Sequence, residues 1–163
     1  MSRAFVKEMD GDGSEDIPEL AISPHRNLVT PAGLAHIDAM LRRLDGELAA
    51  ARAVEDRATV ARVERDLRYW SSRRSTAEVV DPVARPAAVR FGCTVELQTA
   101  AGERVRFKIV GEDESNPAQG RISYVSPLAR RLLAEGVSPP IRLVISLAIP
   151  ARVRIKHWPR SRN

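Results

Sequence analysis

Cysteine, aromatic residues and long apolar runs are scarce in this 163-residue chain, and each scarcity excludes a class of protein. The one cysteine, Cys93, cannot form an internal disulfide, which excludes a disulfide-stapled fold. Aromatic residues make up only 4% of the chain, so Leu, Val, Ile and Ala must build the core. No apolar run approaches the roughly 20 residues that span a bilayer, and no secretory leader is recognisable. We expect a cytoplasmic protein that binds no membrane.

Catalytic patterns are equally scarce. The three histidines, His25, His36 and His157, have no nucleophile, glycine-rich phosphate loop or metal-ligand spacing beside them. Cys93 lies in an alternating apolar run, where a small buried side chain is a simpler interpretation than a reactive thiol. We therefore predict no catalytic residue, no metal or cofactor in the free protein and no small-molecule substrate.

Charge is unevenly distributed along the chain. The net charge is +5, but residues 1–29 hold six acids against three bases, a balance of −3, which leaves +8 for the rest. A basic body favours an anionic partner, either nucleic acid or an acidic face of another protein. Residues 1–29 also lack apolar periodicity, so we predict a disordered acidic tail there.

Residues 30–81 carry apolar side chains at alternating spacings of three and four, the pattern of a coiled coil. Thr30 followed by Pro31 is a strong helix start, and Asp56 is a plausible cap for a returning helix that runs to about Val79. Two seams facing each other antiparallel give the pairs Ala51 with Val60, Leu48 with Val63, Leu44 with Leu67, Leu41 with Trp70, Ile37 with Arg74 and Leu34 with Ala77. The sequence therefore predicts a protruding helical finger.

The register places Glu55 and Asp56 at the tip of this finger. A polar tip that meets water and a functional pair of carboxylates are both open interpretations. The outer faces are rich in arginine, at positions Arg42, Arg43, Arg52, Arg57, Arg62, Arg65, Arg68, Arg73 and Arg74. A solvated surface balanced by neighbouring acids is the simpler interpretation, and docking against a negatively charged channel or strand is the alternative.

The period of the apolar pattern changes after residues 82–88, whose prolines and alanines predict a linker. Apolar residues then alternate along two strands joined by a turn at Ala101-Gly102: Phe91, Cys93, Val95 and Leu97, then Val105, Phe107 and Ile109. The remaining predictions are a polar loop at 111–120, a strand at 122–125, a helix at 128–135, and a closing strand pair at 141–149 and 151–158. Residues 89–158 thus form a small β-rich domain, followed by a basic tail at 159–163.

Three motifs lie in this order after the finger and linker. They are Phe91-Gly92 with Val95, Ile109-Val110-Gly111-Glu112-Asp113-Glu114, and Ile122-Ser123 with Ser126-Pro127-Leu128-Ala129-Arg130-Arg131-Leu132-Leu133. Together they resemble the Gre family of bacterial transcription elongation and transcript-cleavage factors, GreB-like members in particular, with a shortened coiled-coil hairpin. The resemblance implies an α+β fold: an N-terminal antiparallel coiled-coil helical hairpin, then a small FK506-binding-protein-like antiparallel β domain with one short helix.

The resemblance also implies a partner, the core of bacterial RNA polymerase. Family members insert the hairpin into the secondary channel, where tip acids hold a magnesium ion of the polymerase and promote RNA hydrolysis. The implied sites here are Glu55 and Asp56 at the tip, Ser123, Val125, Ser126 and Pro127 at the channel rim, and the basic finger surface of Arg52, Arg57, Arg62 and Arg65. Indirect contact with nascent RNA or DNA is also implied.

The finger departs from the family pattern at its tip. The family tip reads approximately Asp-x-x-Glu-Asn on a longer hairpin, whereas Glu55 and Asp56 are adjacent on arms shorter by about two turns, or roughly 11 Å. We therefore expect an elongation regulator that is not itself an enzyme and stimulates cleavage weakly or not at all.

The sequence leaves two alternatives open. One is a short-fingered rim binder that resembles the regulator of nucleoside diphosphate kinase. The other is a prolyl isomerase of the FK506-binding type, whose pocket needs a richer aromatic lining than Phe91, Phe107, Tyr124 and Trp158 provide.

Overall fold

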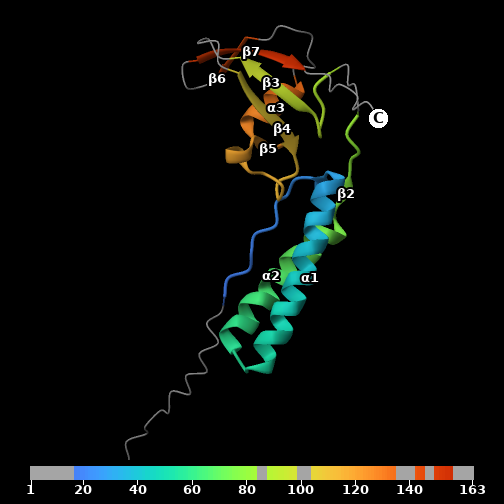
Figure 1. Ribbon diagram of the computed structural model, residues 1–163, viewed down its shortest axis with the longest axis vertical. Helices are drawn as coiled ribbons and strands as arrows, with labels where there is room; N and C mark the ends of the chain where they lie inside the picture. The colour runs from blue at the N-terminus through green and yellow to red at the C-terminus, as the bar shows by residue number, and fades with distance from the viewer. Residues whose placement is uncertain (1–16, 84–87, 99–103, 135–141, 146–148, 156–163) are drawn as a thin grey trace, which may run out of the picture.

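The computed structural model describes residues 17–83, 88–98, 104–134, 142–145 and 149–155, and places a helical finger and a β domain end to end (Figure 1). Two long helices form the finger, and a five-stranded sheet with a short helix forms the β domain. This arrangement confirms the predicted α+β fold.

The finger begins at the predicted cap. Helix α1 spans Pro31–Ala53, and the Thr30 hydroxyl accepts a hydrogen bond from the Gly33 amide at 3.0 Å. Proline at the first helical position removes an amide that would have no helical partner. Helix α2 spans Arg57–Ser75 and follows its own cap, Asp56.

The register of the two helices agrees with the predicted seam. Ile37, Leu44 and Val63 are the most buried seam positions, with exposed fractions of 1%, 1% and 0%. Cross-helix ion pairs flank the seam where the register places their helices side by side: Glu47 with Arg62, Asp38 with Arg74, and Arg52 with Glu64. Arg74, which the predicted register pairs with Ile37, contacts α1 through Asp38 at 2.6 Å, and 47% of its side chain is exposed.

Helix α2 ends earlier than predicted, at Ser75 rather than Val79. The chain then forms strand β2, Glu78–Val79, which pairs in parallel with strand β1, Leu28–Val29. After the helix, the backbone bonds to the N-terminal segment instead of forming another helical turn. The Glu78 amide donates to the Asn27 carbonyl at 2.8 Å.

The prediction of a disordered tail through residue 29 is therefore wrong for its last residues. Val29 is 1% exposed, and the Asn27 side-chain amide donates to the Arg73 carbonyl at 2.6 Å. A strand of two residues is too short to show apolar periodicity, so the sequence held no signal for it. Residues 1–16 lie outside the described part, as do 84–87 of the predicted linker and the whole predicted basic tail at 159–163.

The sheet has the strand order β5-β4-β3-β7-β6. The strands are β3 (Thr94–Gln98), β4 (Arg104–Val110), β5 (Arg121–Ser123), β6 (Arg142–Ile145) and β7 (Ile149–Ile155). All neighbours pair antiparallel except β4 and β5. That pair is parallel because the loop at 111–120, which contains the short helix η1 (Pro117–Gln119), carries the chain back before β5 begins.

The sheet packs its core against helix α3, Pro127–Ala134. The buried cluster comprises Val89, Val95, Leu97, Ile109, Ile122, Ala129 and Leu132. Cys93 is buried, as predicted. The closing strand pair is present, but Pro150 lies inside β7 opposite Val144 rather than between the strands. Among the described residues, β7 pairs with β3 from Arg152 onward, so Pro150 has a described strand partner on one side alone, where proline is tolerated.

We predict that Leu44→Ala destabilises the finger by about 2–4 kcal/mol, because it removes a buried seam side chain and leaves a cavity. Chemical unfolding followed by helical circular dichroism measures the change. The control is Val54→Ala at the finger tip, where 74% of the side chain is exposed and the expected change is within about 0.5 kcal/mol. Equal losses in both variants would contradict the buried seam.

Candidate functional site

Three residues, Val54 to Asp56, connect the helices at the tip. Glu55 has a φ of 55°, in the left-handed region, which reverses the chain direction between the helices. Within the described part of the chain, its exposed carboxylate has no hydrogen-bond or ion-pair partner. The structure thus places both predicted tip acids at the tip, with Glu55 available to an external partner.

Asp56 has a structural role at the same tip. One of its carboxylate oxygens accepts from the Thr59 amide at 3.0 Å, and the other accepts from the Thr59 hydroxyl at 2.7 Å. These bonds, the hydroxyl bond first, lower the pKa of the Asp56 carboxyl from its ordinary value. Because both oxygens face Thr59, the Asp56 carboxylate is oriented as a helix cap.

The basic finger surface is largely neutralised within the finger. Arg52 pairs with Glu64 at 2.8 Å, and Arg65 pairs with Asp66 at 2.6 Å. Arg62 pairs with Glu47 and, at 3.4 Å, with Asp66. Among the described residues, Arg57 has no such partner. The interpretation of a surface balanced by neighbouring acids is therefore correct for Arg52, Arg62 and Arg65.

The predicted rim residues form one turn between β5 and α3. The Ser126 amide donates to the Ser123 carbonyl at 3.0 Å, and the Val125 amide donates to the Ser123 hydroxyl at 3.3 Å. The Ser126 hydroxyl caps α3 by accepting from the Ala129 amide at 3.2 Å, and Pro127 is exposed at the first helical position. The structure thus brings the four rim residues together on one surface turn.

A second site, which the sequence did not predict, joins the finger to the β domain. Arg73, predicted on a solvated outer face, is buried with 2% of its side chain exposed. Its Nε donates to Asp113 at 2.5 Å, and the Tyr69 hydroxyl donates to the other oxygen of Asp113 at 2.6 Å. Glu112 lies 3.9 Å from the Arg73 guanidinium, within ion-pair range but too far for a hydrogen bond. We call this the joint.

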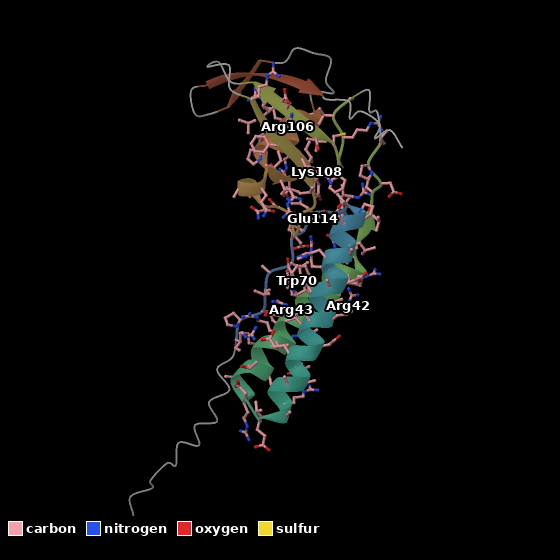
Figure 2. All side chains as sticks on the ribbon, viewed as in Figure 1. Arg42, Arg43, Trp70, Arg106, Lys108 and Glu114 are labelled. Carbon is pink, nitrogen blue, oxygen red and sulfur yellow. The ribbon has the colours of Figure 1, made fainter. Side chains whose placement is uncertain are left out.

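Glu114 extends the joint to the first turn of α1 (Figure 2). Its carboxylate accepts from the Thr30 amide at 2.9 Å, from the Thr30 hydroxyl at 2.5 Å and from the Gly111 amide at 3.2 Å. Gly33 leaves room for it, because a Cβ at that position would lie 2.2 Å from the Glu114 carboxyl carbon. The acidic run at 112–114 therefore holds both helices of the finger.

The sequence did contain one signal for the joint. Tyr69 and Arg73 are four residues apart, so they share one face of α2, and that face points away from the seam. In the sequence, the acidic run at 112–114 is part of the predicted polar loop at 111–120 and of the second of the three motifs. A long-range pairing of this kind leaves no periodic pattern, so the spacing alone did not connect the two segments.

The joint also borders a cleft of about 290 Å³, lined by residues that include His36, Asp113, Glu114 and Arg121. The Asp113 and Glu114 carboxylates in it are already bonded to the finger. His36 is exposed and meets Trp70 edge to face at a ring-centroid distance of 5.8 Å. Among the described residues, no group of three or more potential metal ligands occurs, and no helix is long and apolar enough to cross a membrane.

Comparisons with known proteins decide the family. Over 130 residues, 41% are identical to the transcription elongation factor GreB of Xanthomonas axonopodis pv. citri (strain 306), a match that covers 68% of this chain and 77% of that protein. The chain belongs to the Gre family of transcription elongation factors. A family model described as "Transcription elongation factor, GreA/GreB, C-term" matches residues 84–138.

Other Gre proteins match over shorter stretches. GreB of Neisseria meningitidis serogroup A / serotype 4A (strain DSM 15465 / Z2491) is 45% identical over 73 residues, which span 44% of this chain and 45% of that protein. A solved structure of the prokaryotic transcription elongation factor GreA/GreB from Nitrosomonas europaea is 20% identical, with 80% of this chain and 96% of that chain covered. Its TM-score of 0.35 is too low to support a conclusion.

We predict that Asp113→Asn lowers the pKa of Tyr69. Burial, then the bond to Asp113 and then the Asp113 charge raise the pKa of the Tyr69 hydroxyl to about 12. Because this folded-state pKa lies above the ordinary value of about 10, the linked stability is complete below pH ~10 and is lost as pH rises toward 12. Removing the Asp113 charge lowers the Tyr69 pKa, so the loss of stability is complete at a lower pH.

Tyrosinate absorbance measured against pH, in a Tyr124→Phe background that removes the second tyrosine, gives the Tyr69 pKa directly. The matched control is Ser115→Ala in the same loop, which leaves Asp113 in place and is expected to leave the titration unchanged. An unchanged pKa in Asp113→Asn would show that Asp113 does not hold the Tyr69 proton.

Proposed function

We propose that this chain binds the core of bacterial RNA polymerase and regulates transcript elongation, with the finger in the secondary channel and the β domain at its rim. The observation that supports this most strongly is the 41% identity to a GreB protein over 130 residues. The chain acts as a regulator of the polymerase and is not itself an enzyme.

The geometry of the finger suits insertion into a channel. Helix α1 has 23 residues, which gives a rod of about 34 Å. The joint fixes this rod to the β domain through Arg73, whose buried pair with Asp113 would cost about 3–5 kcal/mol to break by removing one partner. The position of the β domain on the rim therefore determines the depth of the tip.

The two alternatives receive less support. The curated relatives described above are named GreB, which favours an elongation factor over a short-fingered binder of another group. The prolyl-isomerase alternative needs an aromatic pocket, and Phe91 and Tyr124 instead pack edge to face on each other at 5.9 Å. The Tyr124 hydroxyl also donates to the Arg26 carbonyl, which directs its polar end toward the finger side of the domain.

We further propose that transcript cleavage is stimulated weakly or not at all. A carboxylate must lie within about 2–2.5 Å of the metal ion that it holds. The arms are shorter than the family pattern by roughly 11 Å, several times that tolerance. The two Thr59 bonds also orient Asp56 along its own helix, which leaves Glu55 as the single unpaired tip acid among the described residues.

We predict that the protein is retained on immobilised core polymerase at moderate salt, and that Pro127→Glu lowers its affinity about tenfold. Pro127 is exposed on the rim turn, and an acidic residue in the first turn of α3 is compatible with the helix dipole. Binding to core polymerase immobilised on a sensor surface measures the affinity of the unmodified chain and of Pro127→Glu.

The control for charge is Gln119→Glu, a substitution at another exposed position, in η1, that is expected to leave binding unchanged. Absence of retention, while a known channel binder is retained, would refute polymerase binding. Equal weakening in both variants would refute the rim assignment.

We predict that addition of the protein to stalled, backtracked polymerase complexes leaves the cleavage rate within a few-fold of the intrinsic rate, since even a 1 Å misplacement can cost on the order of 100-fold. The variants are Glu55→Gln and Asp56→Asn, the latter chosen because asparagine still caps a helix. Both are expected to match the unmodified chain. Robust cleavage that both substitutions abolish would show that the tip reaches the catalytic metal.

A further inference from the structure

Strand β4 carries positively charged residues on the face of the sheet that lies away from helix α3. Phe107 and Ile109 belong to the core that α3 covers. Because successive side chains of a strand point to opposite faces, Arg104, Arg106 and Lys108 lie on the other face. Figure 2 shows Arg106 and Lys108 on the β domain. Three cations therefore follow one another along a single strand.

The neighbouring strand β5 adds a fourth cation to this face. The parallel register pairs Lys108 with Arg121, and residues that pair across strands share a face of the sheet. Core residue Ile122 follows Arg121 and points the other way. We call Arg104, Arg106, Lys108 and Arg121 the sheet patch.

A buried carboxylate orients two arginines of the sheet patch. Glu96 on β3 pairs with Arg106 at 3.1 Å and with Arg104 at 3.5 Å, and 6% of its own side chain is exposed. The side chains of Arg104 and Arg106 remain 58% and 60% exposed. Each guanidinium has five N–H donors, so one shared carboxylate leaves most of these donors facing water.

The other two cations of the sheet patch have no ion-pair partner among the described residues. Lys108 is half-buried, and the exposed Arg121 guanidinium donates to the neutral side chain of Gln119 at 2.7 Å. Four cations therefore share the single carboxylate of Glu96. The basic finger surface differs, because most of its arginines are paired with acids. The unneutralised positive charge lies on the sheet.

The shape and composition of this face favour the backbone of a nucleic acid duplex. Arg104 and Lys108 are four residues apart on β4, about 13 Å. One strand of duplex DNA has a phosphate every ~3.4 Å along its axis, so about four phosphates span that length. Single strands bind by stacking their bases on aromatic side chains. Among the described residues of β3, β4 and β5, the positions on this face contain no aromatic residue.

We propose that the sheet patch binds the phosphate backbone of duplex DNA without sequence preference. Its four cations contact phosphate oxygens, and Glu96 is a positioning residue for Arg104 and Arg106. Contacts of this kind fix a protein on the duplex and carry no sequence information. The proposal does not rest on the function proposed above, because the patch needs no polymerase to bind DNA.

The patch is tested by fluorescence anisotropy with the full-length chain and a labelled duplex of about 20 base pairs, without polymerase. At ~0.05 M salt we expect a Kd of about 10⁻⁵ M or tighter. The variant Lys108→Gln with Arg121→Gln breaks no described ion pair, and circular dichroism checks its fold. We expect its affinity to fall about tenfold. The slope of log affinity against log salt should become shallower by about 1.8, since each lost phosphate contact accounts for about 0.9.

The matched control is Arg42→Gln with Arg43→Gln on α1, which removes the same charge from two exposed positions on the finger (Figure 2). We expect its affinity to change less than about twofold, because neither arginine lies on the sheet. Equal losses in the two double variants would overturn the proposal, since net charge alone would then explain the binding. An unchanged affinity in the Lys108 and Arg121 variant, or no binding by the unmodified chain, would overturn it as well.

The partner is tested by titrating labelled poly-glutamate and a matching single strand in parallel. We expect both to bind more weakly than the duplex. Poly-glutamate binding as tight as duplex binding would show that the patch suits an acidic protein, and equally tight single-strand binding would show that it does not select a duplex. Failure to bind polymerase would refute the proposed function and would leave all of these readouts unchanged.

Discussion

The buried pair between Arg73 and Asp113 is the interaction on which the arrangement of this molecule depends. A guanidinium with 2% of its side chain exposed cannot stay there without a counterion, so α2 and the acidic loop must remain together. Tyr69 adds a neutral hydrogen bond to the same carboxylate, and burial keeps that hydroxyl protonated. The finger is consequently an extension of the β domain with a fixed direction.

Because the joint holds the finger against the β domain, the position of the β domain sets the position of the tip. The tip residues connect the helices and cap α2, while the rim turn caps α3. Each functional candidate is therefore supported by local hydrogen bonds that also serve the fold. Differences in function among proteins with this architecture can then arise from finger length and tip chemistry, without a change in the joint or the sheet.

The parts of the fold that repeat a period were predictable from the sequence. The seam of the finger follows from the three- and four-residue spacing around Leu44, and the cap at Thr30 follows from a threonine before a proline. Strand β1 was missed because two residues cannot show a period. The joint was missed because Arg73 and Asp113 are 40 residues apart, and the shared helix face of Tyr69 and Arg73 does not indicate which acid they contact.

The hydrogen bond between Thr30 and Glu114 bears on the order in which the molecule folds. The finger is built from contacts between residues close in the sequence, and such local structure forms quickly. The bond from the Thr30 hydroxyl to Glu114, by contrast, closes a separation of 84 residues and completes the start of α1 with a group that is synthesised late. During synthesis the two helices can therefore pair before Glu114 leaves the ribosome, and the β domain sets their direction afterward, when Arg73 first meets its carboxylate.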